Sequence, residues 1–241
     1  MLRQIDLEQM TLDDRLREKA RINASMNGEP IRVFWHGQAR HATGMYASAR
    51  TARSQPWREP VQRSRLWICE VDPAVSTYLA QPHVVSVPFE GKHRNVFIPD
   101  LRIDYRDGSV GIETIFDRRR PPRAAAMDFA RELYEGMGWS YRVVKRPDVD
   151  RGFALANAQV VEADKFTKTT SRTIRTAAEF LAGCGGMAPY ARLIEALGGG
   201  TQGRAALHAL VVRGHLHFDI EGRLCADTAI RPLRNWIGDL T

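Results

Sequence analysis

The chain has 241 residues, a length that allows one large domain or two modest ones. Hydrophobic residues make up 44% and charged residues 26% of the sequence, the proportions of a globular protein, which excludes a chain that is disordered throughout. The formal net charge of +7 favours polyanionic partners, of which nucleic acid is the most common.

The three cysteines, Cys69, Cys184 and Cys225, stand far apart, without a CxxC motif or a zinc-type Cys/His cluster. This pattern predicts reduced thiols, no disulfide and no structural zinc. The N-terminus has no apolar signal region, and no run approaches the roughly eighteen apolar residues of a membrane span. We therefore expect a soluble, cytoplasmic protein that does not enter a membrane.

The first third of the chain contains two predicted helices. A charged stretch with a thin apolar stripe indicates a solvent-facing helix over residues 7–23, and residues 31–34 are expected to form a short strand. Pro60 stands at the first turn of a helix predicted over residues 60–71, which Asp72 and Pro73 end.

Between these helices, residues 47–54 form a basic, serine-rich segment. Its composition predicts a surface loop. Arg50 and Arg53 are candidate contacts for phosphate groups, and an ordinary solvated loop is the alternative interpretation.

Residues 95–115 place two of their acidic side chains, Asp100 and Glu113, on strands that are expected to be neighbours. The β-branched and aromatic residues predict one strand over 96–105 and another over 110–115, with a hairpin turn at Asp107 and Gly108. The turn folds Asp100 back towards Glu113.

Pro99 cannot donate a hydrogen bond within a sheet, so a bulge is expected there that directs Asp100 into a cleft. Two carboxylates in one cleft favour a divalent cation or a shifted pKa. The alternative is a solvated hairpin with both carboxylates on its polar face.

A buried strand is predicted over residues 84–89, ahead of these two strands, and a helix over 124–137 and a last strand over 141–144 follow them. The order helix, three meandering strands, helix, strand predicts an α/β domain with a mixed sheet. Its basic clusters are candidate DNA contacts, namely Arg118, Arg119, Arg120 and Arg123 before the second helix, and Lys145 and Arg146 after the last strand.

This order resembles the PD-(D/E)xK nuclease fold, and more closely the TnsA family of transposon-end endonucleases. The segments that carry the resemblance are SARTAR (48–53), EVDPAV (70–75), QP (81–82), IPD (98–100), YRDG (105–108) and GIE (111–113). The resemblance implies a restriction-endonuclease-like core. In this family a helix glutamate, a strand aspartate, a Glu or Gln on the next strand and a lysine two residues later build a Mg²⁺-dependent catalytic site.

Two of these four positions differ in this chain. Asp100 and Glu113 match, whereas Gln62 stands at the position of the helix glutamate and Ile115 at that of the lysine. An amide brings no charge to a metal, and isoleucine neither polarises water nor meets a phosphate. The resemblance therefore implies that Asp100 and Glu113 are remnants of a catalytic site, with weak metal binding or none.

These residues predict a DNA-binding, TnsA-like protein that is catalytically silenced and acts as an accessory or regulatory component of DNA transposition, without a cofactor. The alternative is an active Mg²⁺-dependent endonuclease that cuts transposon ends with a migrated site. In that case Glu59 replaces Gln62, and Arg118 or Lys92 replaces the missing lysine.

A polar, threonine-rich linker over residues 165–171 predicts a domain boundary near residue 168, which gives domains 1–168 and 169–241. In the second domain we expect helices over 173–181, 189–197 and 202–213, the last capped by Thr201, and a hairpin of strands 215–220 and 223–226. Three helices followed by a hairpin form a winged-helix-like α+β pattern.

The third helix of this domain has few polar side chains, namely Thr201, Gln202, Arg204 and His208. A helix that reads bases usually presents more donors, so contact with duplex DNA through Arg204 and docking to a protein partner stay equally open. The resemblance implies a transposase or an ATPase regulator as that partner. Isolated histidines such as His83, His93 and His215 have no partner at metal spacing and are expected to be polar surface or strand residues.

Overall fold

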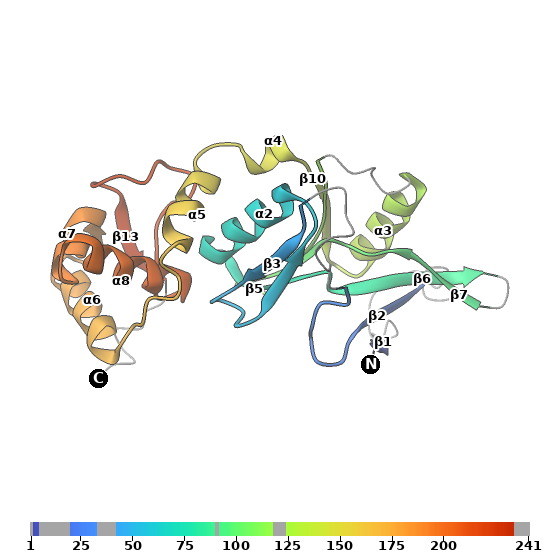
Figure 1. The fold of residues 1–241 in the computed structure, drawn as a ribbon, viewed down its shortest axis with the longest axis horizontal. Helices are drawn as coiled ribbons and strands as arrows, with labels where there is room; N and C mark the ends of the chain where they lie inside the picture. The colour runs from blue at the N-terminus through green and yellow to red at the C-terminus, as the bar shows by residue number, and fades with distance from the viewer. Residues whose placement is uncertain (1, 5–19, 33–41, 90–91, 118–123, 234–241) are drawn as a thin grey trace. The chain divides into compact units, whose positions relative to one another are not determined.

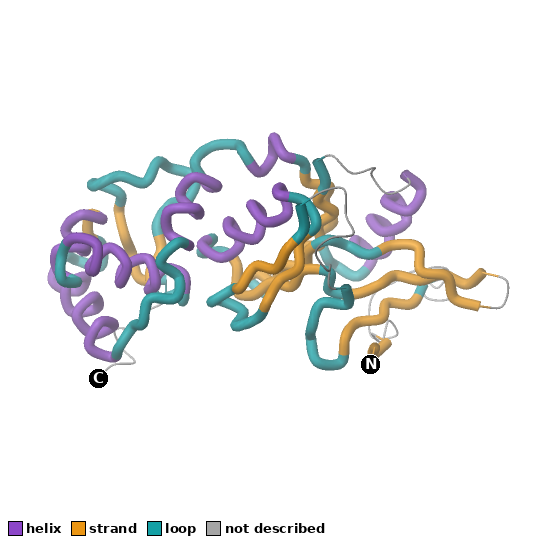
Figure 2. The backbone as a smooth tube through the Cα atoms, in the orientation of Figure 1, coloured by secondary structure: helices purple, strands orange, loops and turns teal. Residues whose placement is uncertain are grey.

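The structure is a computed structural model that describes residues 2–4, 20–32, 42–89, 92–117 and 124–233 (Figure 1). Its contacts divide the chain into two compact units. The first comprises Met1–Ala47, Ser54–Arg63 and Ala74–Asp148, and the second comprises Ser48–Arg53, Ser64–Pro73 and Val149–Thr241. Figure 2 shows mostly strands in the first unit and mostly helices in the second, so the chain is a mixed α/β protein.

The first unit is built on a mixed four-stranded sheet with the order β10-β9-β8-β5. Strands β5 (Val75–Ala80), β8 (Leu101–Tyr105) and β9 (Val110–Ile115) are antiparallel, and β10 (Ser140–Val144) lies parallel to β9. Helix α3 (Ala124–Gly136) makes the crossover between the two parallel strands. The predicted mixed sheet, the Asp107-Gly108 turn and this helix are confirmed, whereas β5 was not predicted.

A second sheet of this unit has the order β1-β2-β6-β7. Its strands are β1 (Leu2–Gln4), β2 (Arg21–Ser25), β6 (His83–Phe89) and β7 (Lys92–Phe97). The single strand predicted over residues 96–105 is therefore wrong, because β7 and β8 belong to different sheets. The chain changes sheets at the segment that contains Pro99, which has no backbone N–H for a ladder.

The N-terminal predictions are partly corrected. A helix that extends to residue 23 is wrong, because Arg21–Ser25 is a strand whose Ile22 is fully buried and pairs with Val85; residues 5–19 lie outside the described part. Residues 31–32 are not in a strand, and 33–34 also lie outside it. The predicted helix α2 (Pro60–Val71) is confirmed.

The predicted loop at residues 47–54 is the turn and the adjoining strand ends of a hairpin. Its strands β3 (Gly44–Ala47) and β4 (Ser54–Trp57) pair antiparallel. The segment between them is therefore short and returns the chain directly, instead of forming an open arm.

The core of the first unit lies between α3 and strands of both sheets. Its members are apolar or aromatic side chains at alternate strand positions and on one helix face: Ala20, Ile22, Val85, Phe97, Ile112, Ala130, Leu133, Tyr134 and Tyr141. His83 bonds to this core through Nε2, which lies 2.6 Å from the Tyr134 hydroxyl. His83 is a strand residue, as expected, but it is 1% exposed, and burial lowers its pKa to about 3.

The second unit contains helices α5 (Ala154–Glu162), α6 (Ser171–Gly183), α7 (Tyr190–Ala196) and α8 (Gly200–Val212). Strands β11 (Ala188–Pro189), β12 (Leu216–His217) and β13 (Ala229–Pro232) form a small sheet with the order β11-β13-β12. A short helix, α4 (Arg146–Val149), follows β10. Because α5 packs against α8, the predicted boundary near residue 168 falls inside this unit, and as a boundary between independent domains it stays a prediction.

The three helices predicted for this region are confirmed as α6, α7 and α8. Thr170 caps α6 through a reciprocal contact with Thr173, whereas Gly199, and not Thr201, precedes α8. In the described residues no helix is long and apolar enough to cross a membrane.

The hairpin predicted over residues 215–226 is wrong, because β12 pairs with β13 and the residues between them form a loop. Asn157 holds this loop: its Nδ2 donates to Ile220 O at 2.8 Å and to Gly222 O at 2.7 Å, and its Oδ1 accepts from Leu224 N at 3.2 Å. These side-chain bonds satisfy backbone groups that a second strand would otherwise pair.

Candidate functional site around Asp100

Asp100 lies directly before β8 and continues the pairing of that strand with β9. Its backbone N donates to Glu113 O at 2.9 Å, and its carbonyl accepts from Gln81 N at 3.0 Å. Asp100 is 4% exposed. The backbone contacts hold the aspartate at the edge where the predicted catalytic residues meet.

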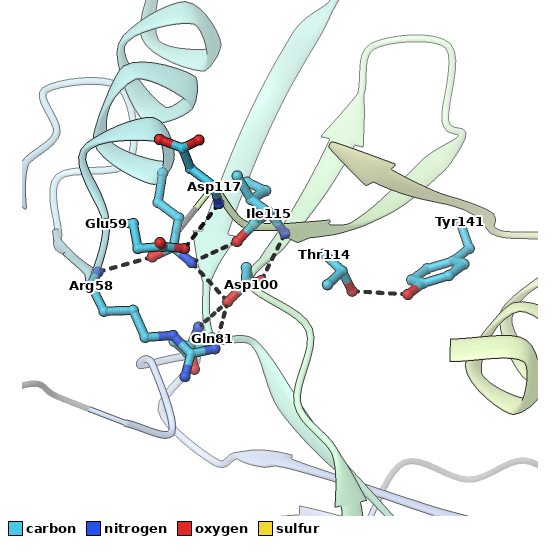
Figure 3. A network of polar contacts seen from close by, with 9 residues as sticks. Arg58, Glu59, Gln81, Asp100, Thr114, Ile115, Asp117 and Tyr141 are labelled. Carbon is cyan, nitrogen blue, oxygen red and sulfur yellow. Dashed lines mark hydrogen bonds and ion pairs between the residues drawn. The ribbon is translucent and has the colours of Figure 1, made fainter. Parts of the chain in front are cut away.

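Four donors surround the Asp100 carboxylate (Figure 3). Oδ1 accepts hydrogen bonds from Arg58 Nη2 at 3.0 Å, Gln62 Nε2 at 3.0 Å and Gln81 Nε2 at 3.2 Å, and Oδ2 accepts one from Ile115 N at 2.7 Å. Oδ1 thus accepts from three donors and Oδ2 from one. In this arrangement hydrogen-bond donors, one of them the Arg58 cation, surround Oδ1.

The Gln62 side chain is oriented by groups on both sides. Its Oε1 accepts from Arg58 N at 2.9 Å, while Nε2 donates to Ile115 O at 3.0 Å as well as to Asp100. The amide nitrogen thus faces two acceptors. A glutamate in the same place would put an oxygen against both of them, which is favourable only with a cation between the oxygens.

Glu113 is brought next to Asp100 through the backbone, as the predicted turn required, but its side chain has a separate cation. Arg142, its neighbour on β10, donates to Glu113 Oε1 through Nε at 2.8 Å and also through Nη2. Because side chains alternate along β9, Thr114 points to the other face, where its hydroxyl bonds to Tyr141 at 2.9 Å. Each of the two carboxylates is therefore paired with its own arginine.

Ile115 and Glu59 are the other positions on which a cleavage site would depend. Ile115 is 1% exposed and contributes only its backbone groups to the network. Glu59 is 2% exposed, and its Oε2 accepts from Asp117 N at 3.3 Å. The Glu59 carboxylate thus lies beside the end of β9, within the same group of residues (Figure 3).

Arg58 is the residue of this network that the sequence did not indicate. It lies four positions before Gln62, with Glu59 and Pro60 between, in a segment without a motif. Arg58 reaches Asp100 because the start of α2 lies beside the ends of β5, β8 and β9. No local sequence pattern predicts that packing.

Residues 48–50 of the SARTAR segment contact the end of α2, where the EVDPAV segment begins, in the second unit. Glu70, which is fully buried, accepts from Ser48 Oγ at 2.8 Å and from the backbone N–H groups of Ala49 at 2.7 Å and Arg50 at 3.0 Å. Arg50 in turn donates to Glu70 O at 3.0 Å and to Asp72 O at 3.2 Å. The Arg50 side chain therefore caps the end of α2. The assignment of Arg50 and Arg53 as phosphate contacts stays a prediction.

The other predicted DNA contacts within the described residues are exposed or half-buried. Arg53 and Lys145 are exposed, Arg146 donates to Asp117 at 2.8 Å, and exposed Arg204 lies 3.7 Å from Asp164. Arg118, Arg119, Arg120 and Arg123 lie outside the described part of the chain, as does the side chain of Lys92.

The exposed polar side chains of helix α8 lie only in its first turns, at Thr201, Gln202 and Arg204. All residues from Ala206 to Val212 are buried, including His208, which was expected to be one of its polar positions. His208 Nε2 lies 2.7 Å from the Tyr190 hydroxyl and Nδ1 lies 2.7 Å from Asp164 Oδ2. Burial lowers the pKa of His208, and the Asp164 carboxylate opposes that shift.

Among the described residues, no group of three or more histidine, cysteine or acidic side chains has a geometry that could hold a metal ion. Comparison with models of known protein families gives no match. No curated protein sequence matches the chain either.

Proposed function

We propose that this chain is a duplex-DNA-binding protein with a TnsA-like nuclease core and a winged-helix-like second domain, in which a hydrogen-bonded ion pair replaces the catalytic centre. It acts as an accessory or regulatory component of DNA transposition and does not cut DNA. The observation that carries the proposal is the Asp100 carboxylate, with the Arg58 guanidinium and the Gln62 amide in contact with it.

The charges around Asp100 support a cation-free site. The Arg58 guanidinium supplies the positive charge that a divalent metal would supply, and Gln62 supplies a donor in place of a third carboxylate. A metal would have to displace both, which would take the Asp100 acceptor away from the partly exposed Arg58 guanidinium and from one N–H of the buried Gln62 amide.

The missing lysine supports the same proposal. Ile115 has no group to position water or to stabilise charge on a phosphate, and losing one charge-stabilising group commonly reduces a rate by about 10²- to 10³-fold. The neutral residue at position 62 adds a second loss. Cleavage at this centre would therefore fall below detection.

DNA binding is supported by the net charge of +7. Such binding is expected to weaken steeply with salt, because each phosphate contact releases counterions. A transposase or an ATPase regulator is the protein partner that the proposed family implies for the second domain.

One observation favours the second candidate, an active Mg²⁺-dependent endonuclease with a migrated site. Glu59 is buried beside Asp117 at the end of β9. The network therefore contains a carboxylate that could take the place of the glutamate missing at position 62. In that candidate function Glu59 belongs to the metal site, and Arg58 must leave Asp100 when DNA and Mg²⁺ bind.

A nicking assay on supercoiled plasmid with Mg²⁺ or Mn²⁺ separates the two functions. We expect the wild-type chain to bind duplex DNA without nicking it, and Asp100→Ala to leave DNA affinity in metal-free buffer nearly unchanged. Nicking by the wild type that Asp100→Ala and Glu59→Gln both abolish would establish the endonuclease instead.

A restored variant tests the assignment of the silenced positions. Gln62→Glu, Ile115→Lys and Arg58→Ala together return the helix carboxylate and the lysine and remove the competing guanidinium. Metal-dependent nicking by this variant, abolished by adding Asp100→Ala, would support the proposal. The matched control carries Arg58→Ala and Ile115→Lys with Gln62 retained, and should remain inactive.

A further inference from the structure

The burial of α8 raises the question of which surface of the second unit meets DNA. Apart from Arg204, the exposed polar side chains of α8 are those of Thr201 and Gln202, because Ala206–Val212 are buried. A major groove also admits a two-stranded β-ribbon. Strand β12 follows α8 directly and pairs with β13, whose first two residues pair with β11.

Side chains of this ribbon alternate between an apolar and a basic face. Leu216 and Ile230 are 1% and 0% exposed, and Phe218, beyond the end of β12, is 2% exposed. His217 lies opposite Arg231 in the antiparallel register, and exposed Arg231 therefore shares the outer face with His217.

His215 extends this outer face, and Arg213 at the end of α8 is close enough for its charge to act on His215. His215 stands two residues before His217, on the same side of the chain, and its carbonyl accepts from Leu233 N at 2.9 Å, which continues the pairing. Arg213 is exposed and donates to Ala209 O at 3.2 Å, at the end of α8. Among the described residues, this face therefore carries Arg231 and two imidazoles, with the Arg213 charge near His215.

The neighbouring charges act on both histidines in the same direction. Burial and then Arg213 lower the pKa of His215, and burial and then Arg231 lower that of His217. The nearest acidic residue in sequence is exposed Asp219, two positions after His217, and its Oδ1 accepts from Glu221 N in the loop. Both imidazoles therefore bind protons less readily than a free imidazole, and they gain affinity for protons when a polyanion covers the arginines.

We propose that the outer face of the β12–β13 ribbon, formed by Arg213, His215, His217 and Arg231, binds the phosphate backbone of duplex DNA. This inference rests on the proposed DNA-binding function and assigns the contact to the ribbon instead of α8. Binding takes up protons at the two histidines, so affinity rises as the pH falls.

Fluorescence anisotropy of a labelled DNA duplex, with the full chain over a range of salt concentrations, tests this assignment. Arg213→Gln with Arg231→Gln should weaken binding about tenfold or more and reduce the slope of log affinity against log salt by about two. The matched control, Arg172→Gln with Arg175→Gln, removes two exposed charges from α6 and should change affinity less than about twofold. Circular dichroism checks that both variants are folded.

The pH dependence gives a second measurement. Wild-type affinity should increase from pH 8 to pH 6, and His215→Gln with His217→Gln should remove that increase. Equal losses in the ribbon variant and the α6 control would overturn the site while leaving DNA binding intact. A wild-type chain that binds no duplex would overturn the proposed function, and the ribbon assignment with it.

Discussion

Each compact unit contains a polar pair in which one side chain is buried and its partner reaches water, but the buried partner differs in kind. In the first unit it is Asp100, whose side chain alone is 1% exposed, and its partner is Arg58, whose side chain is 26% exposed. In the second it is the His208 imidazole, 0% exposed, paired with Asp164, which is 22% exposed. The first is a buried acidic group, and the second is a base that can be neutral.

This difference shows how much freedom each site has. A buried carboxylate needs donors at all times, and Asp100 has four of them. A neutral imidazole needs only one donor and one acceptor, which Tyr190 and Asp164 provide. The network around Asp100 is therefore the more costly to rearrange, which supports a structural role for this carboxylate.

The largest effect is expected from removing the exposed partner of the buried acid. Arg58→Ala leaves Asp100 without its cation and should lower the free energy of unfolding by about 3 kcal/mol. Chemical denaturation measures this change. The control is Asp104→Ala, which breaks the Arg102–Asp104 pair, both about one-third exposed, and should cost less than about 1 kcal/mol. Equal costs for the two variants would contradict the comparison.

A buried neutral group provides a reference without any ionic contribution. Asn157→Ala removes three hydrogen bonds to the loop after β12 and should cost about 2 to 3 kcal/mol. Gln159→Ala, an exposed position on the same helix, should change stability by less than about 0.5 kcal/mol. If Asn157→Ala were equally mild, the loop would not depend on this side chain.

His83 sharpens the comparison. Like His208 it contacts a tyrosine hydroxyl, in its case that of Tyr134, but the charge that acts on its pKa is the positive charge of Arg102. Its pKa of about 3 lies below the unfolded value of 6.5, so the unfolded chain binds an extra proton between these limits. Stability is complete above pH 6.5 and falls with decreasing pH, by roughly 2 kcal/mol between pH 7 and pH 5. His83→Gln should remove that part of the acid loss in denaturation curves; an unaltered pH dependence would mean that His83 is not its source.

The smallest effect is expected from removing the exposed partner of the buried base. Asp164→Ala leaves one His208 ring nitrogen without its acceptor and should cost about 1 kcal/mol. The pKa of His208 should fall further, because the carboxylate that opposes its burial is gone. Nuclear magnetic resonance titration of the imidazole checks the direction. A rise of that pKa would show that Arg204 and burial do not dominate once Asp164 is absent.

The sequence determined those elements whose signals are local. β-Branched and aromatic residues with the Asp107-Gly108 turn specified the β8–β9 hairpin, Pro60 specified the start of α2, and the polar linker over residues 165–171 marked the start of α6. The adjacency of Asp100 and Glu113 also followed from the turn, since a hairpin fixes which residues face each other.

Only the tertiary structure decided what surrounds these residues. Arg58 reaches Asp100, Asn157 replaces a strand as partner of the loop at 220–224, and α5 packs against α8, which is buried from Ala206 to Val212. Each of these contacts joins segments that are far apart in the chain, and the periodicity of a segment reports only which of its faces is apolar. The partner that satisfies a buried polar group is set by packing, so the chemistry around Asp100 had to be found in three dimensions.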